Sequence, residues 1–404
     1  MNEPIALPYG DPSFVADPFP FYRRLREEGP VRRVMTGTGH ESWMISRYDD
    51  VVAAMSDSRL SCDFRDSADP RLLTELSSDQ GGLARSMLRV NPPDHTRLRR
   101  LVSKAFTARR TAELAPRIQQ VTDQLLDAVM PAGRVDLVGD FALPLTVVVI
   151  SELLGVPEGD RDGFQEWTDT MLVPRSADQT DLRRMEEAGL RMRTYLESLL
   201  AARQAHPGDD LLSALIAARD EDQRLDQEEL LANVFLLLVA GHISTVDMIG
   251  TSILGLLTHP DQLKLLRDDP ELLPGAIEEF LRHDGPSSPG VARFATEDID
   301  IGGVTIPRGA TVMVAIAIAG RDPARFPEPD RIDITRPNNA HLAFGHGLHY
   351  CIGAPLARLE GRIAISTVLR RLPDLSLAVP FDELRWPAAS LRGPIQLPVT
   401  FDPS

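Results

Sequence analysis

The stretch Phe344-Gly345-His346-Gly347-Leu348-His349-Tyr350-Cys351-Ile352-Gly353 is the most informative part of this 404-residue chain. Gly345 and Gly347 permit sharp turns and allow the backbone to approach a flat ligand closely. Cys351 stands shortly before an apolar segment, 354–372, that is predicted to form a helix. The amide groups and the positive dipole at a helix start favour a thiolate over a thiol. The stretch therefore predicts a cysteine sulfur that binds a metal ion.

Two other interpretations of Cys351 are open at this point. Together with His346 and His349 it offers ligand types that bind zinc, although no fourth ligand and no CxxC pair are evident. A single cysteine is also commonly an inert buried thiol. The glycines around Cys351 favour a bound flat ligand over both alternatives.

The composition limits which kinds of partner the protein can bind and which cellular compartment suits it. The chain has 43 Lys and Arg against 59 Asp and Glu, a formal net charge of -16, which repels nucleic acid and anionic lipid. Cys62 and Cys351 are the two cysteines, so there is no framework of disulfides and a reducing compartment is expected. Residues 1–11 show no signal-peptide pattern. We therefore expect a cytoplasmic protein without nucleic acid or membrane partners.

One run of sequence departs from this acidic balance. A solvated helix face with long basic stems is one explanation of it, and a docking surface for an acidic protein is the other. Residues 95–112 contain no acidic side chain but six basic ones: Arg97, Arg99, Arg100, Lys104, Arg109 and Arg110.

The distribution of apolar residues predicts a mainly α protein with a minor β region. Residues 1–90 mix short helices with strand-like pieces, 91–285 are predicted to be helical, and 286–404 hold β pieces, the Cys351 loop and a last helix. No linker or repeat is evident, so we expect a single domain over 1–404. Strands are predicted at 42–45, 299–301, 304–306, 311–314 and 396–401, and helix boundaries at Pro144, Pro157, Pro174 and Pro207.

The longest apolar segment is predicted to be one buried helix that begins after Asp226. Asp226 and Glu229 have the spacing of a capping box, and the helical pattern continues to Thr258. At 1.5 Å per residue such a helix is about 50 Å long, and one so apolar has to be covered on all sides. A lipid-facing span would not tolerate its polar residues, which are Asn233, His242, Ser244, Thr245 and Asp247.

The ten residues around Cys351 resemble the haem-binding signature of the cytochrome P450 family, Phe-x-x-Gly-x-x-x-Cys-x-Gly. The resemblance implies the P450 fold, with a long central helix over a buried haem b, and a haem-thiolate monooxygenase that uses O2. It spans the chain, because three further landmarks stand in the family's order. They are the stretch 91–100, the Glu-x-x-Arg motif Glu279-Phe280-Leu281-Arg282 with Arg336 downstream, and Arg321-Asp322-Pro323 with Phe326 and Pro329-Asp330.

The resemblance also assigns residues to the haem. Cys351 is implied to be the axial ligand of the iron, in a loop that also supplies Phe344, Gly345 and Gly353. Arginine suits buried propionates because it donates several hydrogen bonds at once. Plain surface or structural positions are the alternatives for Arg99, for His95 and for the Glu279 and Arg282 pair. The residues implied to reach the propionates are His95, Arg99, Arg293 and His349.

The central helix departs from the family pattern. Ala240-Gly241-His242-Ile243-Ser244-Thr245 stands where members usually have Ala/Gly-Gly-x-Asp/Glu-Thr. Gly241 is implied to open the helix where dioxygen sits, and Ser244 takes the alcohol position, followed by the hydroxyl of Thr245. Ile243 replaces the acid that relays protons. These four are the candidate catalytic positions, with Ile243 as the departure.

Three explanations of Ile243 are open. Protons reach the site through water and Ser244, with help from His242 or a substrate hydroxyl; or the enzyme follows a radical route such as ring coupling or desaturation; or the position tolerates the change. Proton transfer by a positioned group contributes about 10²–10⁴ in rate. Loss of the acid therefore predicts slow turnover or electrons lost as hydrogen peroxide.

The resemblance is strongest to actinobacterial members that tailor polyketides, macrolides and other secondary metabolites, so we expect a large lipophilic substrate. Electrons are implied to come from ferredoxin and ferredoxin reductase, because no nucleotide-binding fingerprint is present, which favours Arg97–Arg110 as a docking patch. A haem-binding sensor without turnover is the non-enzymatic alternative. Apolar residues more often belong to a core than to a pocket, and only the resemblance assigns a substrate pocket to Met87, Leu88, Leu236, Val239, Ala240, Pro289, Val291 and Leu391.

Overall fold

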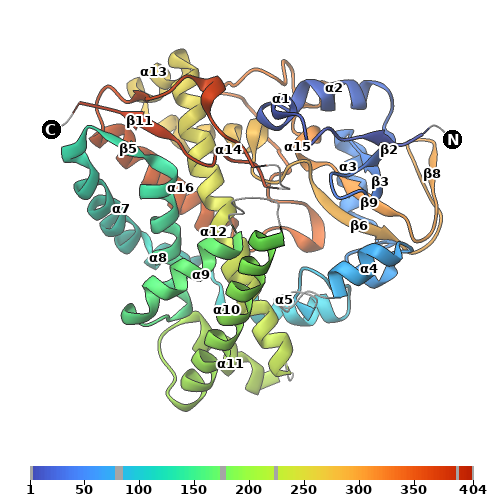
Figure 1. Cartoon of the computed structure of the whole chain (residues 1–404), viewed down its shortest axis with the longest axis horizontal. Helices are drawn as coiled ribbons and strands as arrows, with labels where there is room; N and C mark the ends of the chain where they lie inside the picture. Colours follow the sequence, from blue (N-terminus) through green and yellow to red (C-terminus); the bar gives the residue numbers. More distant parts are fainter. Residues whose placement is uncertain (1–2, 78–84, 173–178, 223–225, 388–390, 403–404) are drawn as a thin grey trace.

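The computed structural model describes residues 3–77, 85–172, 179–222, 226–387 and 391–402. It confirms the mainly α fold with a minor β region. In Figure 1 a β-rich part lies on the right near the N-terminus, and helices fill the left and lower parts. The helix α12 (Gln227–Thr258), drawn in yellow, runs through the centre of the molecule.

A six-stranded sheet forms most of the β-rich part. Strands from the start of the chain pair with strands from its last third, with Trp43 opposite Val312 in a parallel pair. Ile45, Val312 and Val314 are fully buried and pack in one cluster with the helix over residues 48–56. In spatial order the strands are β1 (Ile5–Ala6), β2 (Val31–Met35), β3 (Glu41–Ile45), β9 (Thr311–Val314), β6 (Val291–Ala295) and β4 (Leu60–Ser61).

Helices make up most of the remaining chain. Pro144 lies in the first turn of its helix, where the sequence predicts a helix boundary. Pro174 lies outside the described residues. The bounds are α1 Pro12–Ala16, α2 Phe19–Glu27, α3 Tyr48–Ser56, α4 Pro70–Ser77, α5 Asp94–Ala105, α6 Ala108–Glu113, α7 Ala115–Val129, α8 Leu143–Leu154, α9 Arg161–Leu172, α10 Gln179–Ala205, α11 Leu211–Asp222, α13 Pro260–Asp268, α14 Leu273–Asp284, α15 Ile316–Ala319 and α16 Ala354–Arg371.

The central helix α12 begins where the sequence predicts. The Asp226 side chain accepts a hydrogen bond from the Glu229 amide at 2.8 Å, and the Glu229 carboxylate accepts one from the Asp226 amide at 3.2 Å. This capping box satisfies two amides that a helix start otherwise leaves unpaired. The helix ends at Thr258, as predicted, before Pro260. Helices α8, α14 and α16 pack against it.

The part 91–285, which is predicted to be helical, also contains one short strand that the sequence did not indicate. Residues Arg134–Asp136 form strand β5, which pairs antiparallel with β11 (Pro398–Thr400), and β11 pairs in turn with β10 (Ser376–Leu377). The partner of β5 comes from the end of the chain, so no local pattern reveals the pairing. The predicted strand at 396–401 is shorter than expected, whereas those at 299–301 (β7), 304–306 (β8) and 311–314 are confirmed.

A buried ionic cluster centres on Glu279 in α14. Arg282 donates two hydrogen bonds to the Glu279 carboxylate at 2.7 and 2.8 Å, and Arg336 donates to it at 3.1 Å. Neither Glu279 nor Arg282 has an exposed side chain, so the surface ion pair considered from the sequence is wrong. Arg282 also donates to the carbonyl oxygen atoms of Gly320 and Pro329. The cluster therefore ties α14 to the long irregular segment that leads to the Cys351 loop.

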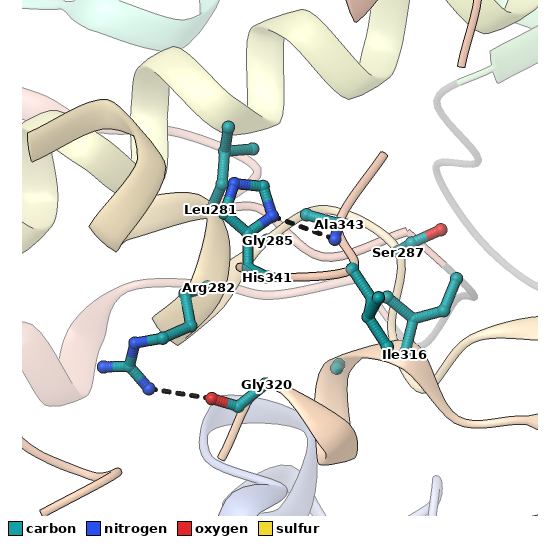
Figure 2. A pocket seen from close by; sticks show the side chains of 10 residues that line it. Leu281, Arg282, Gly285, Ser287, Ile316, Gly320, His341 and Ala343 are labelled. Atoms are coloured by element: carbon teal, nitrogen blue, oxygen red, sulfur yellow. Dashed lines mark hydrogen bonds between the residues drawn. The ribbon is translucent and has the colours of Figure 1, made fainter. Parts of the chain in front are cut away.

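Figure 2 shows a small pocket beside this cluster, lined by residues of α14, α15 and the segment 341–343. Its volume is about 10 Å³, which is room for about one water molecule. Arg282 donates to the Gly320 oxygen at 2.8 Å there, and the His341 ring accepts from the Ala343 amide at 3.1 Å. This pocket is too small for an organic substrate. It is a packing gap between α14, α15 and the segment that precedes the Cys351 loop.

Two helical segments, 137–154 and 227–258, are long and apolar enough to cross a membrane. Most of each segment is buried by the rest of the protein, which is the normal situation for core helices. The second of them is α12, in which the polar residues Asn233, His242 and Thr245 are buried against other parts of the protein.

Replacing Glu279 tests the ionic cluster. Glu279→Gln leaves Arg282 and Arg336 buried without a counter-charge, and removing one partner of a buried ion pair costs about 3–5 kcal/mol. We expect a clear fall in the urea midpoint of unfolding, followed by circular dichroism. Glu113→Gln, which removes one half of the exposed pair with Arg109, is the control and should change the midpoint little. Equal midpoints for the two variants would show that the cluster does not stabilise the fold.

Candidate functional site

The Cys351 loop is shaped by its glycines. Gly345 and Gly347 have φ values of 78° and 68°, in the left-handed region that side chains other than glycine adopt at a cost. The Cys351 amide donates to the Phe344 carbonyl oxygen at 2.8 Å and closes the loop. Cys351 then lies three residues before the start of α16. The prediction of a turned loop at the start of a helix is confirmed.

The electrostatics of Cys351 differ from the expectation. The side chain is exposed, yet desolvation by the surrounding protein raises the pKa of its thiol. The amides of Gly353 and Ala354 and the charge of Arg99 act in the opposite direction but do not outweigh it. A helix start alone therefore does not hold a thiolate here, whereas a bound metal cation deprotonates a coordinating thiol directly.

The structure also decides between the alternatives for Cys351. Within the described residues no three His, Cys, Asp or Glu side chains come together to hold a metal ion, so His346, His349 and Cys351 do not form a zinc site. Cys351 is exposed rather than buried, which contradicts the inert core thiol. An accessible sulfur at a glycine-rich loop is what a large flat ligand requires.

Basic side chains gather near this loop. The rings of His95 and His349 lie with their centroids 4.1 Å apart, and Arg99 donates to the Tyr350 carbonyl oxygen at 2.6 Å. Arg293 is buried in β6, and His95 is buried in α5. Burial, followed by repulsion from His95, Arg293 and Arg99, lowers the pKa of His349 to about 3. Residues from α5, β6 and the Cys351 loop are thus brought together as predicted.

This basic cluster lacks a counter-charge from the protein. Among the described residues, no Asp or Glu pairs with His95, His349, Arg99 or Arg293, and neither ring nitrogen of His95 has a hydrogen-bond partner. Buried cations and unsatisfied ring nitrogens cost free energy unless an anion completes them. The donor set fits two carboxylates of a bound ligand, and it therefore fits the propionates of a haem whose iron meets Cys351.

A stripe of accessible residues runs along the otherwise buried helix α12. The positions repeat at three and four residues, which places them on one face of the helix. The residues on either side of the stripe, 230–238 and 248–256, are buried. A core helix with one accessible face borders an internal space, and five of the predicted residues lie on this face. The stripe consists of Val239, Ala240, Gly241, Ile243, Ser244 and Asp247.

The polar residues of α12 have different partners. The Ser244 hydroxyl donates to the Ala240 carbonyl oxygen at 2.8 Å, and the Thr245 hydroxyl donates to Gly241 at 3.2 Å. Ser244 is accessible and its oxygen keeps acceptor capacity, whereas Thr245 is buried. His242 is buried with Nδ1 2.8 Å from the Thr146 hydroxyl of α8, and burial lowers its pKa to about 4. His242 is therefore neutral and turned toward α8, so help from His242 in proton delivery is not supported.

The eight predicted substrate residues fall into three groups. Met87 and Leu236 are buried near the start of α12, where the Met87 amide donates to Asn233, and Leu88 beside them is exposed. Leu391 forms a β-bridge with Ser287, which places it beside the segment of Pro289 and Val291. Val239 and Ala240 lie on the accessible stripe between the ends of α12. Met87 and Leu236 are mainly core residues in this structure.

Fewer side chains of the basic run Arg97–Arg110 are available to a partner protein than the sequence predicts. Arg97 is paired with Glu229 at 2.6 Å, and Arg110 lies 3.5 Å from Asp209. Arg99 belongs to the basic cluster. Arg100 is exposed, and no acidic partner is found for it among the described residues. The surface that can meet a partner is thus centred on Arg100 and the exposed Lys104 in α5.

Sequence reasoning missed two residues of this region. The Cys62 sulfur lies 3.1 Å from Nε2 of His349, so the second cysteine belongs to the basic cluster rather than to a distant core. Asp247 ends the accessible stripe of α12. Its only signal in the sequence is a carboxylate within a very apolar segment, one turn after Ile243.

Comparisons with known proteins point to one family. The family described as Cytochrome P450 matches residues 16–374. Cytochrome P450 monooxygenase PikC of Streptomyces venezuelae is 48% identical over 390 residues, covering 96% of this chain and 91% of PikC. Mycinamicin IV hydroxylase/epoxidase of Micromonospora griseorubida is 43% identical over 385 residues, covering 94% of each chain.

The fold is similar to solved structures as well. The structure of the bacillaene polyketide synthase cytochrome P450 PksS of Bacillus subtilis 168 superposes with a TM-score of 0.88 at 37% identity. The match covers 99% of this chain and 100% of that chain.

Proposed function

Because the chain belongs to the cytochrome P450 family, we propose that Cys351 holds the iron of its haem b and that the enzyme oxidises a large lipophilic substrate. The enzyme is a haem-dependent monooxygenase, as its relatives are. The observation that carries the assignment of Cys351 is its accessible sulfur, set near four basic side chains that lack a protein counter-charge.

The haem, when bound, supplies the activation of dioxygen, and the overall reaction is RH + O2 + 2 H⁺ + 2 e⁻ → ROH + H2O. Arg293, Arg99, His95 and His349 would hold the two propionates and so fix the cofactor against the Cys351 loop. Gly241 presents no side chain on the accessible stripe, which leaves room beside α12. Ser244 offers a hydroxyl that accepts and passes on a proton at its Oγ atom.

The substrate class follows from the relatives and from the lining residues. One relative is named a hydroxylase/epoxidase for mycinamicin IV, and another belongs to polyketide biosynthesis. In this chain Val239, Ala240, Val291 and Leu391 offer apolar, partly accessible surface without charge. We therefore propose hydroxylation or epoxidation of a polyketide- or macrolide-like secondary metabolite. Ring coupling or desaturation is the second candidate, and Ile243 is the observation that favours it.

The electron donor is proposed from the surface of α5. Soluble bacterial members of the family use ferredoxin and ferredoxin reductase, and Arg100 and Lys104 give α5 a basic face close to the Cys351 loop through Arg99 and Tyr350. An acidic ferredoxin is complementary to this face. A cytoplasmic location is proposed with it, because two unpaired cysteines suit a reducing compartment.

Cysteine replacement tests the iron ligand. Cys351→Ala removes the sulfur, so we expect loss of the thiolate-specific absorption band of the reduced, carbon monoxide-bound protein. Cys62→Ala is the matched control because it changes the other cysteine, beside His349, and should keep that band. A wild-type band that persists in Cys351→Ala would refute the assignment.

Charge reversal tests the docking surface. Arg100→Glu should slow reduction by ferredoxin by about tenfold at low ionic strength, and the difference should shrink with added salt, since steering by exposed charges is screened. Stopped-flow reduction under carbon monoxide measures the rate. Arg308→Glu, an exposed position in the β8–β9 turn, is the control with the same change of charge. Equal rates for both variants would place the docking surface elsewhere.

A further inference from the structure

A carboxylate lies one helical turn from the position where this chain lacks its acid. Asp247 follows Ile243 by four residues and Ser244 by three, so all three share the accessible stripe of α12. Residues at this spacing have Cβ atoms about 5–6 Å apart, a gap that one water molecule can bridge. No hydrogen bond or ion pair to the Asp247 carboxylate is found within the described residues. Its oxygen atoms therefore remain available to water in the internal space.

The surroundings of Asp247 make room for this carboxylate. A Cβ atom at Gly393 would lie 2.1 Å from one Asp247 oxygen and 2.6 Å from its carboxyl carbon. Any residue larger than glycine at 393 would collide with the acid. The segment 391–394 thus forms a wall against which the carboxyl group packs, between α12 and the substrate-side residue Leu391.

Few charged groups face Asp247. Asp284 of α14 is the charged neighbour that acts on it, and Asp284 is itself paired with Arg392 at 2.5 Å. His242 of α12 is neutral and contacts Thr146. Glu360 of α16 is buried, and desolvation alone raises its pKa.

Burial and the negative charge of Asp284 raise the pKa of Asp247 to about 7. An acid with this pKa is partly protonated and partly ionised at neutral pH. It can therefore both give a proton and take one back, which is the condition for efficient general acid catalysis near pH 7.

We propose that Asp247 is the proton donor for oxygen activation, passing protons through water to the Ser244 hydroxyl in place of the acid that Ile243 replaces. The O–H bond of the Asp247 carboxyl breaks as a proton moves to the bridging water, and that water gives a proton to Ser244 Oγ while the Ser244 hydroxyl releases its own proton to the oxygen that is being reduced. Solvent water returns a proton to the carboxylate. Two such protons per O2 match the two electrons from the redox partner, and no other reactant is needed.

This inference rests on the proposed function, and its first test is coupling. Asp247→Asn keeps the size of the side chain but cannot donate an acidic proton. A positioned acid contributes about 10²–10⁴ in rate, so we expect the fraction of electrons recovered as oxidised substrate to fall by at least about tenfold, with free hydrogen peroxide rising to match. The solvent deuterium isotope effect on turnover should increase.

Two further variants separate proton delivery from structural damage. Adding Ile243→Glu to Asp247→Asn should restore coupling, whereas Ile243→Glu alone should change it little because the native donor is present. Gly393→Ala keeps the acid but displaces it, so it should lower coupling while a carboxyl group remains. Glu228→Gln, an exposed acid in the first turn of the same helix, is the control and should leave coupling unchanged.

A second readout does not depend on turnover. Carboxyl infrared difference spectra of the resting protein should show one group that titrates near pH 7, absent from Asp247→Asn. The raised pKa means that the folded protein binds this proton more tightly than the unfolded chain does. Wild-type stability should therefore fall as pH rises from about 4 to 7 relative to Asp247→Asn, and the difference should level off above that range.

The outcomes are distinguishable. Unchanged coupling in Asp247→Asn, or no carboxyl titration near pH 7, overturns the role of Asp247 and leaves the proposed function intact. A wild-type protein without the thiolate-specific band, or without product from dioxygen and electrons, overturns the proposed function itself. Lost coupling that Ile243→Glu rescues in the double variant supports the relay and cannot come from a folding defect.

Discussion

The Cys351 site depends on two arginine charges and two imidazole rings for which no acidic partner is found among the described residues. His95, His349, Arg99 and Arg293 converge from three elements, and no acidic side chain among the described residues neutralises them. Burying such charges is unfavourable until an anion arrives. Under the proposed function the propionates of the haem would supply this anion, so cofactor binding would stabilise the fold around the Cys351 loop. The same cluster fixes the orientation of the Cys351 loop, since Arg99 is bonded to the Tyr350 carbonyl oxygen.

On the other side of that loop the charges are balanced within the protein itself. Around Glu279 the protein supplies its own charges, two arginines and one carboxylate, together with the Asn339 amide and the Asp333 backbone amide. This cluster needs no ligand and can form while the chain folds. It joins α14 to residues 320–339, which have little regular structure of their own. The Glu279 cluster thus positions the segment before the Cys351 loop without any ligand. The basic cluster on the other side of the loop lacks an anion, which the proposed cofactor would supply.

The sequence predicted most of this arrangement where the information is local. The glycines of 344–353, the capping box at Asp226 and the paired strands 299–301 and 304–306 depend on neighbours within a few residues, and all are confirmed. Pairings between distant segments were missed, because β5 finds its partner at the end of the chain. The basic run was overestimated for the same reason: Glu229, 132 residues away, neutralises Arg97. At Cys351 the Gly353 and Ala354 amides lower the pKa of the thiol as predicted, but desolvation by distant parts of the chain, which no local pattern reveals, raises it by more.

Burying a polar side chain on an apolar helix costs free energy unless it is hydrogen-bonded, so each polar residue of α12 requires an explanation. Asn233 accepts from the Met87 amide and donates to the Glu229 carbonyl oxygen, which fixes the chain before α5 to the start of the helix. His242 contacts Thr146 and locks α12 against α8. Ser244 lies on the accessible face. Asp247 is the one for which no hydrogen bond or ion pair is found within the described residues, although an unpaired carboxylate shielded from bulk water costs more than an unpaired amide or hydroxyl. An acidic side chain without a structural partner is best explained by a role in catalysis. Because Asp247 lies one helical turn from Ile243, we infer that it takes over the proton donation for which position 243 lacks an acid.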